Sequence, residues 1–237
     1  MSKFSKISEI NVSDPLTWRG RQFLTFDIDW APDPVLEYTI DLVEKFQVPA
    51  TWFVTHQTVL LERLRRNSNF ELGLHPNFNT LLAGAAGEKK NASEVIAELK
   101  KVVPEACSVR SHSLVQSERL VDDFVEYGLF SISNFYIPWN AGISLKPWSL
   151  WADVVAIPHS WQDNVSMRLN EIVEAEPPYD PEGVNVYDFH PVHVFLNTGT
   201  MSHYENCREY YHNPEELLER RSKEPGVFDT LMRLLSK

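Results

Sequence analysis

The stretch RQFLTFDID, residues 21–29, is an apolar run that ends in two acidic residues, Asp27 and Asp29. Strands buried on both faces of a parallel sheet are almost continuously apolar, so this run predicts an interior strand. Alternate side chains of a strand point to the same face, so we expect both carboxylates to face one pocket. A cation or an arginine between them would relieve their repulsion. The alternative is a solvated turn after the strand, where aspartate is common.

Further apolar runs alternate with amphipathic segments along the rest of the chain. After residues 21–29, the predicted strands are 50–56, 69–75, 107–113, 130–136, 152–158 and 183–190. The predicted helices are 34–46, 56–67, 92–103, 117–129, 213–223 and 226–237. Strands separated by helices favour right-handed crossovers, and about seven parallel strands favour an α/β barrel over an open sheet. We expect a single domain over residues 1–237, with residues 1–20 as a polar lead-in.

The bulk composition limits the classes of partner. The net charge is −11, which weighs against nucleic acid or anionic membranes, because both need a basic surface. No run of about 18 apolar residues occurs, and the first residues lack the features of a signal peptide, so we expect no membrane span. The two cysteines, Cys107 and Cys207, are predicted to be free thiols. These features favour the cytoplasm.

Polar residues gather where the predicted strands end. Five of the eight histidines lie at or just past such an end, and they are His75, His112, His159, His190 and His193. Ligands bind at the carboxyl ends of parallel strands, so this arrangement predicts an active site there. Taken singly, each histidine would more often be structural.

Several of these residues suit metal or acid–base chemistry. His75 can bind a metal ion, and Asn79 offers a weaker amide oxygen four residues later. Arg110 can pair with a buried carboxylate such as Asp27, although most arginines are surface residues. His112 could bind a metal, contact a substrate or bond to a backbone carbonyl.

The segment DFHPVHVFLNT, residues 188–198, holds His190 and His193. Its apolar VHVFLN portion predicts a strand that passes into a loop. Either histidine could serve as a general acid, since the pKa of an imidazole lies near neutrality. The alternative is a pair of core histidines bonded to backbone groups.

The ordered set of motifs resembles a known family. The motifs are TFDID (25–29), ATWFV (50–54), ELGLHPNFN (71–79), VRSHS (109–113), IPHSWQDN (157–164) and DFHPVHVFLNT (188–198). Their order is similar to that of the NodB-type polysaccharide deacetylases, carbohydrate esterase family 4. HPNFN, RSHSL and FHPVHVFLNT look most like the WbmS-like branch. The resemblance covers roughly residues 21–198 and implies a distorted (β/α) barrel with one divalent metal ion.

The resemblance also implies roles for the first group of residues. Asp27 matches the family's catalytic base and Asp29 its first metal ligand, with one residue inserted between them. His75 matches the second ligand, and Asn79 stands where the family has a third, a histidine. Three possibilities follow: Asn79 binds through its oxygen, His112 takes its place, or the metal is absent.

The remaining motifs imply the acid and its partners. Arg110 matches the arginine that orients the base, and His112 stands where a proline is usual. Asp163 and Trp161 match loosely the acid and the aromatic residue of the fourth motif. His190 is the first candidate for the general acid, oriented by Asp163, and His193 is the second.

We therefore expect a metal-dependent hydrolase that removes N-acetyl from an amino sugar of a polysaccharide or of its nucleotide-linked or lipid-linked precursor. Zinc is the expected ion, with cobalt, nickel or manganese as alternatives. Expected substrate contacts are Trp30, His112, Trp139 and Trp161, although tryptophans are as often core residues. The alternatives are a metal-free glycan-binding or scaffold protein and a hydrolase of another C–N bond.

Overall fold

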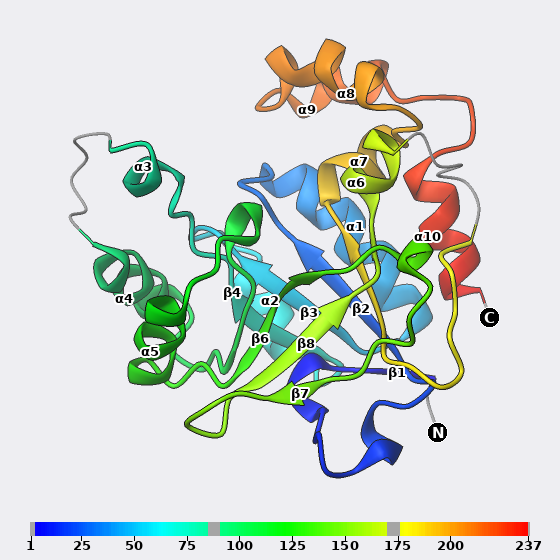
Figure 1. Cartoon of the computed structure of the whole chain (residues 1–237). Coiled ribbons are helices and arrows are strands. Elements are labelled where there is room, and N and C mark those ends of the chain that lie inside the picture. The colour runs from blue at the N-terminus through cyan, green and yellow to red at the C-terminus, as the bar shows by residue number, and fades with distance from the viewer. Residues whose placement is uncertain (1–2, 85–90, 170–175, 237) are drawn as a thin grey trace.

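The computed structural model describes residues 3–84, 91–169 and 176–236, and its centre is a curled, mostly parallel sheet (Figure 1). Seven parallel strands form the body of the sheet: β2 (Gln22–Asp27), β3 (Ala50–Val54), β4 (Phe70–Leu74), β5 (Ser108–Val109), β6 (Ser131–Tyr136), β8 (Val155–His159) and β10 (Asn185–Phe189). The predicted parallel α/β sheet of about seven strands is confirmed.

The sheet closes only at the carboxyl end of its strands. The neighbours run in the order β7-β8-β6-β5-β4-β3-β2-β10-β9. Strand β9 (Trp161–Gln162) follows β8 after Ser160 alone and pairs with β10. The stretch 155–162 therefore pairs with β6 at its start and with β10 at its end, which makes the barrel distorted. The sequence did not predict β7 (Trp148–Ser149), which pairs antiparallel with β8.

Strand β2 shows how the sequence sorts side chains between the two faces of the sheet. Leu24 and Phe26 lie in the main core, which the outer helices share. Phe23, Thr25 and Asp27 point the other way, as the period of two requires. Phe23 packs in a second apolar cluster, whereas Thr25 and Asp27 contact a buried arginine. The interior of the barrel is therefore apolar at the amino end and polar at the carboxyl end.

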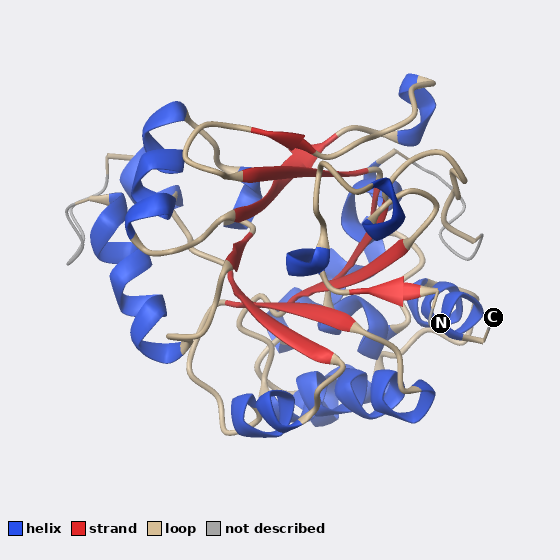
Figure 2. Cartoon of the chain, turned by 90° about the horizontal axis from the view of Figure 1, so that it is seen from below, coloured by secondary structure: helices blue, strands red, loops and turns tan. Residues whose placement is uncertain are grey.

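The helices surround the sheet, as the view from below shows (Figure 2). They are α1 (Asp33–Phe46), α2 (Leu61–Arg66), α3 (Asn79–Leu82), α4 (Ala92–Val102), α5 (Glu118–Glu126), α6 (Asp163–Arg168), α7 (Pro191–Leu196), α8 (Met201–Cys207), α9 (Pro214–Glu219) and α10 (Val227–Leu235). In α1, the buried positions Val35, Leu36, Thr39, Ile40 and Val43 form one face. None of the helices among the described residues combines the length and apolar character that crossing a bilayer requires.

Two segments differ in kind from the structure that the sequence predicted. Strand β10 stops at Phe189, and residues Pro191–Leu196 form the helix α7, where VHVFLN was predicted to be a strand that passes into a loop. All six residues of α7 are buried, so no amphipathic period marks the helix in the sequence. The predicted strand 107–113 is only Ser108–Val109, and a 3-10 helix, η3 (His112–Leu114), follows it.

The first residues do more than lead into the barrel. Strand β1 (Phe4–Ser5) pairs with the start of β2. Ile7, Ile10 and Trp18 are buried against Phe23 in the second apolar cluster. The polar lead-in predicted for residues 1–20 is therefore wrong for the described residues 3–20, because they cover the amino end of the barrel.

Candidate active site

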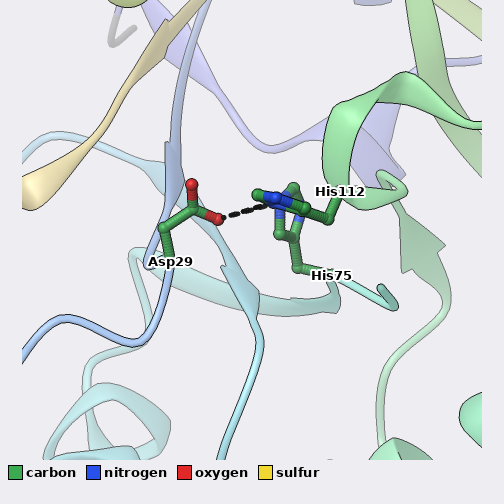
Figure 3. Close-up of side chains that lie close together, drawn as sticks. All are labelled: Asp29, His75 and His112. Carbon is green, nitrogen blue, oxygen red and sulfur yellow. Dashed lines mark hydrogen bonds and ion pairs between the residues drawn. The ribbon is translucent and has the colours of Figure 1, made fainter. Parts of the chain in front are cut away.

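Three side chains from three strand ends converge at the carboxyl end of the barrel (Figure 3). Asp29 Oδ1 lies 3.2 Å from His75 Nε2 and 3.1 Å from His112 Nδ1, and the two ring nitrogens are 3.3 Å apart. Asp29 lies two residues past the end of β2, His75 directly follows β4, and His112 begins η3 beyond β5. The three donors thus form a nearly equilateral triangle.

This triangle fits one divalent cation. Donors bound to a single ion at about 2.0–2.2 Å, with angles near 90–110°, lie roughly 2.9–3.5 Å apart. The three separations at the site fall in that interval. Two imidazole nitrogens and a carboxylate oxygen also form a donor set typical of zinc and related ions. We call Asp29, His75 and His112 the triad.

The backbone at Asp29 is unusual. Asp29 has φ 38° and Trp30 has φ 55°, so two consecutive residues other than glycine lie in the left-handed region. Asp29 therefore lies in a turn beyond β2 and not within the strand. Its carboxylate nevertheless lies near that of Asp27, because His75 Nε2 contacts both. Burial alone would raise the pKa of Asp29, but hydrogen bonds from His112 and His75 hold it well below its usual range.

Asn79 does not join the triad. It is the first residue of α3, its side chain is exposed, and its amide nitrogen donates to Ser113 Oγ at 3.1 Å. Of the two candidates for the third ligand position, the structure brings His112 and not Asn79 to the side of His75. The sequence could not decide this, because it depends on how η3 folds back over Pro76: the His112 N–H donates to the Pro76 carbonyl oxygen.

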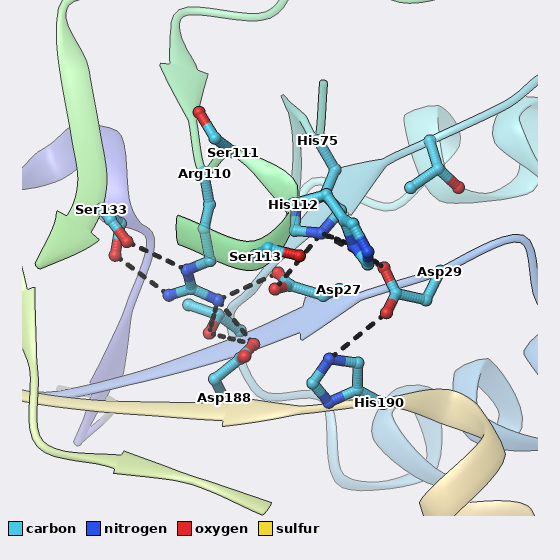
Figure 4. A network of polar contacts seen from close by, with 12 residues as sticks. Asp27, Asp29, His75, Arg110, Ser111, His112, Ser113, Ser133, Asp188 and His190 are labelled. Atoms are coloured by element: carbon cyan, nitrogen blue, oxygen red, sulfur yellow. Dashed lines mark hydrogen bonds and ion pairs between the residues drawn. The ribbon is translucent and has the colours of Figure 1, made fainter. Parts of the chain in front are cut away.

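A buried arginine organises the layer beneath the triad (Figure 4). Arg110 is fully buried, and its Nη1 lies 3.0 Å from Asp27 Oδ1 and 2.5 Å from Asp188 Oδ1. The same nitrogen donates to Thr25 Oγ1, and the rest of the guanidinium donates to the backbone and side chain of Ser133. Arg110 therefore pairs with Asp27, as the sequence predicted. The second carboxylate oxygen of Asp27, Oδ2, lies 3.6 Å from His75 Nε2.

His190 and Asp163 form a buried pair that also borders the triad, and His190 lies close to Asp27 and Asp188 as well. His190 Nδ1 lies 2.7 Å from Asp163 Oδ1, and His190 Nε2 lies 3.5 Å from Asp29 Oδ2. The other oxygen of Asp163 accepts the backbone N–H of His190 at 2.7 Å. Burial opposes a charged imidazole, yet the Asp163 carboxylate raises the pKa of His190 well above its ordinary value. The Asp163 carboxylate thus favours the protonated form of His190, whose Nε2 faces Asp29.

His193 differs from His190 in its surroundings. It lies in α7, its Nδ1 is 3.3 Å from Thr198 Oγ1, and its ring packs against Tyr204. Burial lowers the pKa of His193 to about 4, so the ring is neutral at neutral pH. Of the two candidates for a general acid, only His190 has both a raised pKa and a ring nitrogen close to the triad. A cleft lies over the triad, and Asp29, His112 and His190 are among the residues that line it. His159 is fully buried beside Tyr136 and does not line this cleft.

The predicted aromatic contacts divide into three cases. Trp30 is 37% exposed, lines the cleft over the triad and meets the His112 ring edge-on at 5.1 Å. Trp161 is buried against Phe189 in the main core, so the prediction that it contacts a substrate is wrong. Trp139 is exposed but lines a separate hollow and not this cleft, so the structure does not support its predicted role either.

Comparison with known proteins shows to which family the chain belongs. A family model of WbmS-like polysaccharide deacetylases matches residues 24–208, which is most of the chain. The chain belongs to this family. A candidate polysaccharide deacetylase involved in O-antigen biosynthesis (WbmS) from Bordetella bronchiseptica, known from a crystal structure at 1.90 Å, is 46% identical. The match covers 99% of this chain and 97% of that one, with a TM-score of 0.95. No curated protein matches the sequence.

This WbmS-like site also contains residues that the sequence analysis missed. Asp188 shares Arg110 with Asp27, and Thr25 bonds to both Arg110 and Asp188. Thr25 and Asp188 lie two positions before Asp27 and His190, which were predicted. Because alternate residues of a strand face the same side, this spacing could have identified them. Tyr211 donates to the backbone oxygen of Asp29 at 2.5 Å, although it lies beyond the residues that match the family. No local pattern marks that contact.

Proposed function

We propose that this chain is a metal-dependent N-deacetylase that acts on an acetylated amino sugar of a surface polysaccharide or of its nucleotide-linked or lipid-linked precursor. Family membership supports deacetylation, and the description of the Bordetella relative supports a place in O-antigen biosynthesis. The observation that carries the proposal is the triad beside the arginine-paired Asp27. Cys107 and Cys207 are free thiols, which fits a reaction in the cytoplasm.

The triad would hold the metal, for which zinc is the first choice and cobalt, nickel or manganese are alternatives. A divalent ion supplies polarisation of the acetyl carbonyl and a lower pKa for water. Asp27 takes a proton from the attacking water, and Arg110 fixes the orientation of its carboxylate.

His190 supplies the proton that completes the reaction. Its protonated ring, held by Asp163, gives a proton to the nitrogen of the departing sugar amine. The water oxygen bonds to the carbonyl carbon and the C–N bond breaks, which leaves acetate and a free amine. Trp30 at the edge of the cleft offers a ring face to the sugar.

Acetate release from a panel of N-acetylated amino sugars, with zinc, cobalt or nickel supplied, tests the proposal. We expect turnover by the parent protein. Asp27→Asn should lower kcat by about 10²–10⁴-fold while metal stays bound. Asp41→Asn, an exposed carboxylate on α1, is the matched control and should leave turnover unchanged. Absence of acetate with every sugar and metal contradicts the proposal, and loss of metal in Asp27→Asn contradicts the role of Asp27 as base.

A metal-free glycan-binding protein was the main alternative, and Asn79 was the feature that favoured it. His112 supplies an imidazole beside His75, so Asn79 no longer argues for that alternative. A hydrolase of another C–N bond would use the same groups, and the sugar panel separates it from the proposed deacetylase.

A further inference from the structure

A cleft of about 670 Å³ lies over the triad. Asp29, His112 and His190 line its floor, and its walls come from α6 and from the segment 201–212, which includes α8. Helices α8 and α9 lie together beyond α6 and α7 in Figure 1. A substrate whose acetyl group reaches the triad must therefore extend along these walls.

Two arginines line the walls of this cleft. Arg168 is the last residue of α6 and is exposed, and its side chain makes no hydrogen bond or ion pair with another described residue. Arg208 follows α8 and meets Glu205 Oε2 at 3.5 Å, with side chains 70% and 51% exposed. Exposed pairs at this separation are weak, so the guanidinium of Arg208 remains open to a ligand.

The charge balance of the cleft differs from that of the whole chain. The chain carries a net charge of −11, so two arginines on the cleft walls make the charge there more positive than on most of the surface. Among the described residues that line the cleft, the carboxylates are Asp29 and Glu205. Asp29 lies on the floor and is engaged by the histidines of the site, so the walls carry two arginines against one glutamate. The walls therefore present positive charge to a bound molecule, and a divalent ion at the floor would add to it.

We propose that the cleft walls bind an acidic group of the substrate, a carboxylate or a phosphate, through Arg168 and Arg208. The guanidinium presents paired N–H groups that match both anions in geometry and charge. This inference rests on the proposed function and narrows its substrate class to acidic acetylated amino sugars. The acidic group comes either from the sugar itself, as in a uronic acid, or from a phosphate linkage, as in a nucleotide-linked sugar.

Binding to the Asp27→Asn protein, followed by calorimetry, tests the subsite without turnover. The probes are N-acetylglucosamine, its uronic acid form N-acetylglucosaminuronic acid, and UDP-N-acetylglucosamine. We expect one acidic probe to bind at least about tenfold more tightly than the neutral sugar, with affinity that falls as salt rises. The acidic probe that binds identifies the source of the anion.

Substitution of the two arginines tests whether they cause the preference for acidic probes. Arg168→Gln with Arg208→Gln should remove the advantage of the acidic probe and leave binding of the neutral sugar unchanged. Arg66→Gln, an exposed arginine on α2 paired with Glu62, should change neither. Equal affinity of acidic and neutral probes, or no binding of any acidic probe, overturns the proposal. An equal loss for both kinds of probe in the double variant also overturns it.

Acetate release tests the proposed deacetylase function independently of the acidic subsite. Tight binding of an acidic probe without acetate release by the parent leaves the subsite in place and contradicts deacetylation of that sugar. Acetate release from neutral and acidic sugars at equal kcat/KM supports the deacetylase and contradicts the subsite.

Discussion

Arg110 joins two buried carboxylates through one nitrogen. Its Nη1 contacts both Asp27 and Asp188, and its guanidinium lies 4.6 Å from the Phe53 ring centre. Gly73 allows this stack, because a Cβ there would lie 2.7 Å from two Phe53 ring carbons. The position of Asp27, the proposed general base, therefore depends on packing inside the barrel.

Removal of this arginine should strongly destabilise the fold. Arg110→Met leaves Asp27 and Asp188 buried without a cation, so we expect the free energy of unfolding to fall by about 3–5 kcal/mol. Urea denaturation measures the change. Arg110→Met combined with Asp188→Asn should recover part of the loss, because it removes one of the two unpaired charges. A fall under about 1 kcal/mol in the single variant would contradict the account.

His193 should make the stability of the fold depend on pH. Its pKa is about 4 in the folded protein and about 6.5 in an unfolded chain. The unfolded chain therefore binds the proton first, so this residue lowers stability as pH falls from about 6.5 to about 4. Urea denaturation of His193→Gln should show a smaller loss between these pH values than the parent, by up to about 3 kcal/mol. Identical losses would show that His193 is not the source.

The Tyr211 hydroxyl ties the segment 201–212 to the turn at Asp29 and Trp30. Tyr211 donates to the backbone oxygen of Asp29, and the Trp30 N–H donates to Thr55 Oγ1 at 3.0 Å. Left-handed backbone at residues other than glycine costs of order 1–3 kcal/mol and persists only where the surroundings hold it. These two bonds hold the turn that aims the Asp29 carboxylate at His75 and His112.

Tyr211→Phe should therefore weaken metal binding more than it weakens folding. We expect the zinc Kd, measured by competition with a chelator, to rise by about tenfold. Tyr204→Phe is the matched control, because Tyr204 lines the same cleft but packs its ring on His193. An unchanged Kd in Tyr211→Phe, or an equal rise in Tyr204→Phe, would contradict the role of the Tyr211 hydroxyl.

The elements that the sequence predicted share a long periodic pattern. Helix α1 and strands β2 to β4 lie within two or so residues of the predicted bounds because their burial repeats along many residues. The two-residue strands β5 and β9 and the fully buried α7 have no such repeat. These short elements place Arg110, Asp163 and His190, so the sequence predicted the site residues through the motif resemblance and strand ends and not through their local structure.

The whole molecule brings together residues that lie far apart in the chain. The triad spans Asp29 to His112, and the cleft that covers it reaches His212. The choice between Asn79 and His112 depends on the tertiary contact of η3, which no local pattern reports. The parallel barrel and the site at its carboxyl end could be predicted, whereas the choice of His112 as the third candidate ligand and the cleft walls could not.

Metal should stabilise the entire fold if the triad binds it. A ligand present at about 100 times its Kd adds about 2.7 kcal/mol to the free energy of unfolding. For a chain of this size, chelation should then lower Tm by roughly 5–10 °C. Differential scanning calorimetry with and without chelator measures the shift. Asp29→Ala should show no shift, and an equal shift in this variant would mean that the metal binds elsewhere.

Metal content is the most direct test of the triad. Elemental analysis of untagged protein after zinc loading and desalting should be done on the parent, His112→Ala and Asn79→Ala. We expect about one zinc ion per chain in the parent and in Asn79→Ala, and little in His112→Ala. Retention of zinc by His112→Ala with loss in Asn79→Ala, or no zinc in the parent, would contradict the assignment of Asp29, His75 and His112 as the metal ligands.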